Sequence, residues 1–173
     1  RILSQVQQAV AGMRGMNHGV LLRVDEMPAE DRLLLHERHL VSRELAGLDP
    51  QRPVRSGSAV YLTRDTSIMV NEEDHLRLQS LESGFRVAEA FNHVFALDSE
   101  LGEKVPYAFH NEFGFLTACP TNAGTGLRAS VLIHLPGLVL TKEIAKVLAG
   151  LQQVGLTYRG LYGEGSEVVG NFF

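Results

Sequence analysis

The chain has one cysteine, no excess of basic residues and no long apolar run. Because Cys119 has no partner for an internal disulfide and a lone thiol is typical of a reducing compartment, we expect a cytoplasmic protein. With 16 Lys and Arg against 20 Asp and Glu, the formal net charge of -4 argues against nucleic-acid or membrane-surface binding. No apolar segment is long enough to span a bilayer. Any anionic ligand must therefore be held by arginines close to it.

The length and composition predict a single soluble domain over residues 1–173. Of these residues, 45% are hydrophobic and 21% are charged, which is enough apolar material for a core. We find no internal repeat, low-complexity segment or linker. The chain begins at Arg1 and stops with strand-like sequence at residues 171–173, so we expect a fragment of a longer protein.

Hydrophobic periodicity predicts an α+β fold with a mostly antiparallel sheet flanked by helices. Expected helices cover residues 2–13, 28–41, 85–97 and 141–151, the last with Thr141 as N-cap. Expected strands cover residues 19–24, 60–62, 68–70, 130–135 and 156–161, the second and third as a hairpin. The apolar side chains that we expect these helices to bury include Leu33, Leu34, Leu35, Leu40 and Val41, and Val87, Ala90, Phe91, Val94 and Phe95.

An acidic run, Asn71-Glu72-Glu73-Asp74-His75-Leu76-Arg77, follows directly after an apolar strand. A carboxylate close to like charges has a raised proton affinity, which suits a general base. Because adjacent strand residues point to opposite faces, a metal site with His75 is the less favoured interpretation, and we predict no metal ligands. Taken alone, the run is equally consistent with a solvated acidic turn.

Three arginines lie beside strand-like or glycine-rich backbone: Arg77, Arg128 and Arg159. The rigid guanidinium fork matches phosphate oxygens, so several such side chains together can hold a polyphosphate. For any one arginine taken alone, an ion pair with a surface acid is the more common arrangement.

The only cysteine lies in a segment of turn-forming residues, 119–126. Its glycines allow the backbone to approach a ligand closely, and nearby cations or amide dipoles would favour the thiolate form of Cys119. Against this, most single cysteines are inert and buried. No Gly-Lys-Ser/Thr follows, so the segment is not a Walker-type loop. Glycines also flank Glu164, in a loop that either closes over a site or is a surface loop without function.

Three blocks occur in order along the chain: the acidic run, Cys119-Pro120-Thr121-Asn122 with residues 124–130, and Arg159-Gly160 with Gly163-Glu164. Together they resemble the ATP:guanidino phosphotransferases, the family of creatine and arginine kinases. The resemblance is closest to the bacterial protein-arginine kinases and covers most of the chain from His39 onward. It is carried by Ile133-His134-Leu135-Pro136, by residues 159–167 and by Glu37-Arg38-His39-Leu40.

The resemblance implies a role for each matching residue. Glu73, with its neighbour Glu72, matches the carboxylate that orients the substrate guanidinium. Two roles stay open for Glu73: to accept the guanidinium proton, or only to align the nitrogen. Glu164 matches a second carboxylate, and Cys119 matches the thiol that lies against the guanidinium. In the implied nucleotide site, the phosphates are bound by Arg77, Arg128 and Arg159, and His39 lies near the nucleotide. The pocket is lined by Ala129, Ser130, Val131 and Leu132 and by Gly160, Leu161, Tyr162 and Gly163.

The resemblance also implies the ligands and partners. These are ATP with Mg²⁺ held mainly by the phosphates, and arginine-containing proteins as substrates, with no nucleic acid and no membrane. A second copy of the chain and a protein activator are the candidate protein partners.

The chain departs from the family pattern in two places. We find no strand of the Ser-Ser-Arg-Ile-Arg type, which supplies further phosphate ligands, and Leu132 stands where creatine and arginine kinases have a histidine. The far C-terminal portion of bacterial members is also absent. We therefore expect weak or no turnover from these 173 residues alone.

The sequence thus predicts an ATP-dependent kinase of arginine side chains in proteins. The first alternative is a kinase of small guanidino metabolites of the arginine or creatine type. The second is a non-catalytic remnant that binds nucleotide or arginine for regulation. The presence of Glu73, Cys119 and Glu164 counts against the remnant, because such a protein has little need of all three.

Overall fold

The computed structural model describes residues 1–160 and 169–173, in two compact units, Arg1–Ala129 and Ser130–Phe173. Among these residues, no helix has both the length and the apolar character needed to cross a membrane. A single domain over the whole chain stays a prediction. The first unit contains the larger sheet and nearly all of the buried hydrophobic residues of the described chain.

The first unit is built on a four-stranded antiparallel sheet with the strand order β1-β2-β3-β4. The strands are β1 Val20–Arg23, β2 Ala59–Leu62, β3 Thr66–Val70 and β4 Leu76–Ser80. The predicted antiparallel α+β fold and the β2–β3 hairpin are confirmed. Strand β4 was not predicted, because it is a half-buried edge strand in which only Leu76 and Leu78 pack against the core.

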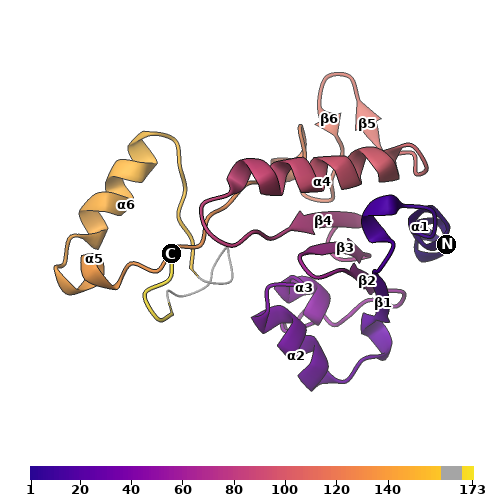
Figure 1. Ribbon diagram of the computed structural model, residues 1–173, viewed down its shortest axis with the longest axis horizontal. Coiled ribbons are helices and arrows are strands. Elements are labelled where there is room, and N and C mark those ends of the chain that lie inside the picture. Colours follow the sequence, from indigo (N-terminus) through magenta and orange to yellow (C-terminus); the bar gives the residue numbers. More distant parts are fainter. Residues whose placement is uncertain (161–168) are drawn as a thin grey trace. The chain divides into compact units, whose positions relative to one another are not determined.

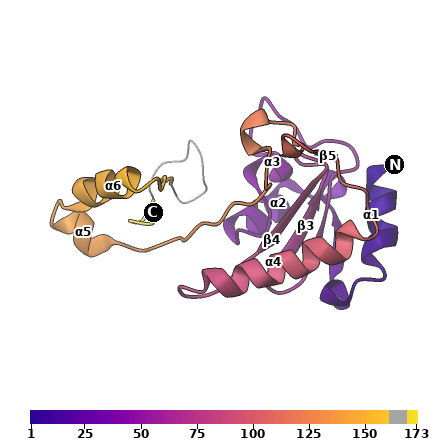
Figure 2. The same cartoon turned by 90° about the horizontal axis from the view of Figure 1, so that it is seen from above.

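Helices cover both faces of this sheet (Figures 1 and 2). Alternate strand residues point to opposite faces, so Tyr61, Ile68 and Val70 pack with α1 Ile2–Val10 and α4 Val87–Gly102. On the other face, Val60 and Met69 pack with residues of α3 Arg43–Ala46 and with Leu35 of α2 Ala29–Glu37. The hydrophobic core therefore consists of two clusters, one on each face of the sheet.

Two of the predicted helix faces were partly wrong. Helix α4 continues to Gly102 and buries Leu97 and Leu101, one turn apart, whereas Phe91 and Phe95 are 41% and 56% exposed and stack on each other at 5.5 Å. In the second helix, Leu33 and Leu34 are exposed. The residue that α2 buries is His36, and Leu40 and Val41 become buried only beyond its end at Glu37. In each helix, the residues that face the core therefore lie on a different helical turn from the residues that were predicted to be buried.

The first unit also contains three short 3₁₀ helices and a two-stranded hairpin. The 3₁₀ helices are η1 Arg14–Met16, η2 Val24–Glu26 and η3 Pro120–Asn122, and the hairpin joins β5 Phe109–His110 to β6 Gly114–Phe115. Phe115 forms a further antiparallel bridge with Gly124. The hairpin is therefore attached to the segment that contains Cys119.

The second unit contains α5 Pro136–Leu140 and α6 Ile144–Gln153. The predicted helix start at Thr141 was wrong: Pro136 opens a separate helix, Thr141 is its C-cap, and the Thr141 hydroxyl donates to the Gly137 carbonyl at 2.9 Å. The predicted strand at residues 130–135 was also wrong, apart from an isolated bridge between His134 and Phe172. Residues 156–159 form no strand either, and Leu161 lies outside the described residues. A strand forms only beside a hydrogen-bonding neighbour, and residues 133–135 have such a neighbour in the short segment 171–173.

Candidate functional site

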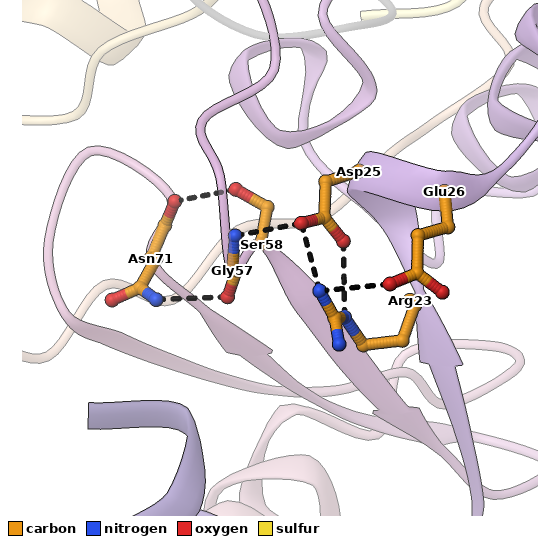
Figure 3. A network of polar contacts seen from close by, with 6 residues as sticks. All are labelled: Arg23, Asp25, Glu26, Gly57, Ser58 and Asn71. Atoms are coloured by element: carbon orange, nitrogen blue, oxygen red, sulfur yellow. Dashed lines mark hydrogen bonds and ion pairs between the residues drawn. The ribbon is translucent and has the colours of Figure 1, made fainter. Parts of the chain in front are cut away.

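The acidic run forms the turn between β3 and β4, residues 71–75, here called the acidic turn. Asn71 has a positive φ of 57°, a backbone conformation that asparagine tolerates better than most residues. Its side-chain nitrogen donates to the Gly57 carbonyl at 2.8 Å, and the Ser58 hydroxyl donates to the Asn71 carbonyl at 3.0 Å (Figure 3). The first residue of the turn is thereby fixed to the loop that precedes β2.

A half-buried ion pair supports that loop from the side of β1 (Figure 3). The Asp25 carboxylate accepts from the Gly57 backbone N–H at 2.7 Å and from Arg23 Nε and Nη2 at 3.0 and 2.9 Å. The hydrogen bond from Arg23 holds the pKa of Asp25 below its usual range, against the opposing effect of burial, and the Gly57 N–H acts in the same direction. No sequence motif marks this pair, because its two residues act on the turn only through the fold.

Glu72 is buried and bonded on both sides. Its carboxylate accepts from Arg77 Nη1 at 2.9 Å and from the Glu73 backbone N–H at 2.6 Å. The Glu72 side chain is 4% exposed, and that of Arg77 is 38% exposed. Arg77 therefore forms an ion pair with an acidic residue, which is one of the two arrangements expected from the sequence. The acidic partner, Glu72, is buried rather than on the surface.

Glu73 is the middle carboxylate of the acidic turn and differs from both neighbours. Its backbone carbonyl accepts from Arg55 Nη1 at 3.4 Å. Its half-buried carboxylate makes no hydrogen bond or ion pair with any residue among 1–160 and 169–173. Within the described part of the acidic cluster, Glu73 is thus the acid that is available to a cationic ligand.

The segment around the cysteine adjoins the acidic turn. Asp74 Oδ1 accepts from the Ala118 backbone N–H at 2.5 Å, 44 residues along the chain. Cys119 is half-buried, with its Sγ 3.0 Å from Thr121 Oγ1, and its carbonyl accepts from the Thr117 hydroxyl at 2.7 Å. Glu73 precedes Asp74, and Cys119 follows Ala118. The two residues that were singled out separately in the sequence are therefore the neighbours of two directly bonded residues.

His39 lies on the sheet face to which Arg77 belongs. Its carbonyl accepts from Gln79 Nε2 at 2.6 Å, and Gln79 is two residues beyond Arg77 in β4, so both side chains leave the same face. Burial, together with the neighbouring His36, lowers the pKa of His39. The imidazole is therefore neutral near pH 7, which suits stacking or hydrogen bonding more than phosphate binding.

The other predicted residues are divided between the two units. Arg128 and Ala129 end the first unit, and Ser130, Val131, Leu132, Arg159 and Gly160 belong to the second. Leu161, Tyr162, Gly163 and Glu164 lie outside the described residues. No group of three acidic, histidine or cysteine side chains in the described ranges is arranged to hold a metal ion. The first unit thus brings together Glu72, Glu73, Arg77 and Cys119.

Known proteins resemble this chain over nearly its whole length. The protein-arginine kinases of Bacillus mycoides (strain KBAB4) and Bacillus cereus (strain G9842) are 48% and 47% identical to it over 153 residues, or 88% of this chain. Those residues are 42% of each relative, so the chain spans less than half the length of these curated proteins.

Two solved structures confirm the fold. The duplicated taurocyamine kinase from Schistosoma mansoni with bound transition state analog components matches with a TM-score of 0.80 and 28% identity, over 99% of this chain and 24% of that chain. Lombricine kinase matches with a TM-score of 0.71 and 25% identity, over 99% of this chain and 50% of that chain.

The chain also matches a protein family over its full length. The model described as ATP:guanido phosphotransferase, C-terminal catalytic domain, matches residues 1–173. Its match agrees with the fold and with the three sequence blocks. The chain therefore belongs to the ATP:guanido phosphotransferase family and corresponds to its C-terminal catalytic domain.

Proposed function

We propose that the protein containing this chain transfers the γ-phosphoryl group of ATP to a guanidinium nitrogen of arginine side chains in proteins. The main structural support is Glu73, the available carboxylate of the acidic turn, held beside the cysteine segment by the Asp74 bond. The names of the Bacillus relatives support arginine in proteins as the acceptor. A single cysteine suits the reducing cytoplasm as its compartment.

The acceptor side of the reaction needs carboxylates. A free guanidinium has a pKa of about 12.5 to 13.8, so it must be oriented and must lose a proton during its attack on phosphorus. In our proposal Glu73 holds the guanidinium and accepts that proton, and Cys119 lies against it. Glu164, outside the described residues, supplies the second carboxylate. Glu72 fixes Glu73 and Arg77 in place, because its carboxylate is already bonded to both.

The nucleotide side needs positive charge at the phosphates. Phosphoryl transfer depends mainly on positioning and on charge stabilisation, and arginines provide both. Arg77 is held by Glu72 through one nitrogen while its side chain stays 38% exposed, so it is oriented and still accessible. We assign Arg128 and Arg159 to the phosphates, and His39, residues 129–132 and residues 160–163 to the rest of the nucleotide site. Mg²⁺ bound to the phosphates would neutralise further charge.

A small guanidino compound is the second candidate acceptor. It is favoured by the match to the taurocyamine and lombricine kinases, whose names state small acceptors. Their identities of 28% and 25% are well below the 48% and 47% of the protein-arginine kinases, so we prefer the protein acceptor. A second copy of the chain and a protein activator remain proposed partners.

Two substitutions test this division of roles. Glu73→Gln should slow transfer to arginine by about 10²- to 10⁴-fold without changing ATP affinity, because it removes the proton acceptor. Arg128→Ala should weaken ATP binding by roughly tenfold or more, because it removes a charge-assisted contact to phosphate. Calorimetric ATP titration and a phosphoarginine assay give the two readouts. Equal loss of ATP binding in both variants would contradict the proposal.

A further inference from the structure

The hydrogen bond between Asp74 and Ala118 links two parts of the proposed site. Asp74 belongs to the acidic turn, and Ala118 belongs to the segment of residues 117–124, here called the cysteine loop. In the described part of the chain, no other hydrogen bond joins these two segments. The acceptor is an ionisable carboxylate, and a hydrogen bond to a charged acceptor is stronger than one between neutral groups.

Each segment is already fixed by contacts of its own. The acidic turn is held by Asn71 at the loop before β2 and by Glu72 at Arg77. The cysteine loop is held by the bridge between Phe115 and Gly124 and by the bond from Thr117 to the Cys119 carbonyl. These contacts hold each segment to its own surroundings but not to the other segment. The Asp74 bond is therefore the contact that positions one segment relative to the other.

We propose that Asp74 is a positioning residue that fixes the acidic turn against the cysteine loop, so that Glu73 and Cys119 meet the same acceptor guanidinium. This inference rests on the proposed function, because it needs Glu73 and Cys119 to act on one substrate group. Glu73 precedes Asp74 and Cys119 follows Ala118, so a shift between the segments moves the two groups apart. A displacement of about 1 Å lowers the rate of such a step by roughly 10²-fold.

Three substitutions of Asp74 separate its hydrogen bond from its charge. Asp74→Ala removes the acceptor, Asp74→Asn keeps an oxygen acceptor without the charge, and Asp74→Glu keeps the charge but moves it by one methylene. The matched control is Asp65→Ala, which removes an exposed carboxylate from the turn before β3. Far-UV circular dichroism establishes that each variant is folded.

The first readout is the alkylation rate of Cys119, the only thiol of this chain, by iodoacetamide. A freed cysteine loop exposes the half-buried thiol, so we expect alkylation about threefold faster or more in Asp74→Ala and Asp74→Glu. Asp74→Asn and Asp65→Ala should react like the parent chain. If Asp74→Ala fails to fold, the contrast between Asp74→Glu and Asp74→Asn decides. Unchanged alkylation in the folded variants, or equal acceleration in Asp74→Asn, would overturn the proposal.

The second readout is kinetic and uses the protein that contains the chain. Asp74→Ala should lower kcat for arginine phosphorylation by about tenfold or more, with the KM for ATP within about twofold. Asp74→Asn should restore most of that loss. A rise in the KM for ATP without a fall in kcat would contradict positioning of the acceptor groups. The thiol readout needs no kinase activity, so failure of the proposed function and failure of this inference give different results.

Discussion

Three adjacent acids in the acidic turn have three different environments. Glu72 is bonded to Arg77, Asp74 is bonded to the Ala118 N–H, and the Glu73 carboxylate has no partner among the described residues. The sequence predicted the run as a carboxylate site, but it left a solvated turn equally open. The division of roles was not predictable, because it depends on a strand partner in β4 and on a backbone N–H 44 residues away.

The ion pair of Asp25 makes the support of the acidic turn sensitive to pH. Its folded-state pKa is lowered, first by Arg23 and also by the Gly57 N–H, so its stabilisation is full above the unfolded value of about 3.9. That stabilisation is lost as the pH falls through the folded value. We therefore expect Asp25→Asn to be less stable than the parent chain near neutral pH, with the difference shrinking on acidification below about pH 4.

Urea unfolding across a pH series measures this effect. Asp65→Asn is the matched control, because the Asp65 side chain is 59% exposed and lies 3.7 Å from Arg64. Its stability should stay close to that of the parent chain at every pH, as expected for an exposed pair. Parallel curves of unfolding free energy against pH for Asp25→Asn and the parent chain would refute the account of this pair.

At the scale of elements, the sequence predicted the strands that are determined by local residue patterns. The apolar runs of β2 and β3, separated by the polar residues 64–66, were enough to predict their hairpin, and the strand Val20–Arg23 was also predicted. The residues that α4 buries were partly mispredicted, because the sheet contacts Leu97 and Leu101 rather than the more apolar first half. The apolar run at residues 130–135 has strand-like composition, yet a strand also requires a neighbour that sequence composition cannot supply.

Gly114 determines how the β5–β6 hairpin meets the cysteine loop. Its φ is 74°, and a Cβ at this position would overlap the carbonyl of Gly124, a backbone group that cannot swing away. Gly84 has a similar φ of 80° but open space around it, so it controls for the cost of the backbone conformation alone. Gly84→Ala should cost about 1 to 2 kcal/mol.

Gly114→Ala should cost roughly 2 kcal/mol more than Gly84→Ala, because the clash adds to the same backbone strain. Denaturant unfolding gives both free energies of unfolding. The bridge between Phe115 and Gly124 should also be lost, which amide hydrogen exchange at those two residues detects. Equal destabilisation by the two substitutions would show that the close approach of Gly114 to Gly124 does not form in solution.

At the scale of the molecule, the residues expected to bind ATP are shared between two units. Arg77, His39 and Arg128 belong to the first, and Arg159 belongs to the second, which contains only one buried hydrophobic residue of the described core, Leu148. The sequence blocks predicted the family, since each block is a local motif, and the residues that they assign to ATP stay a prediction. The contacts of Arg77 with Glu72 were not predicted, because they depend on packing between segments, which no local motif encodes.

The central claim is that the acceptor is an arginine side chain of a protein. The direct measurement incubates the protein that contains this chain with ATP and Mg²⁺ and, in parallel, with an arginine-rich protein, free arginine or creatine. Acid-labile phosphate is then quantified on each acceptor, with Glu73→Gln as the inactive control. The account predicts phosphoarginine on the protein in the parent enzyme and none above background in the control. Phosphate on the free guanidines but not on the protein would contradict it.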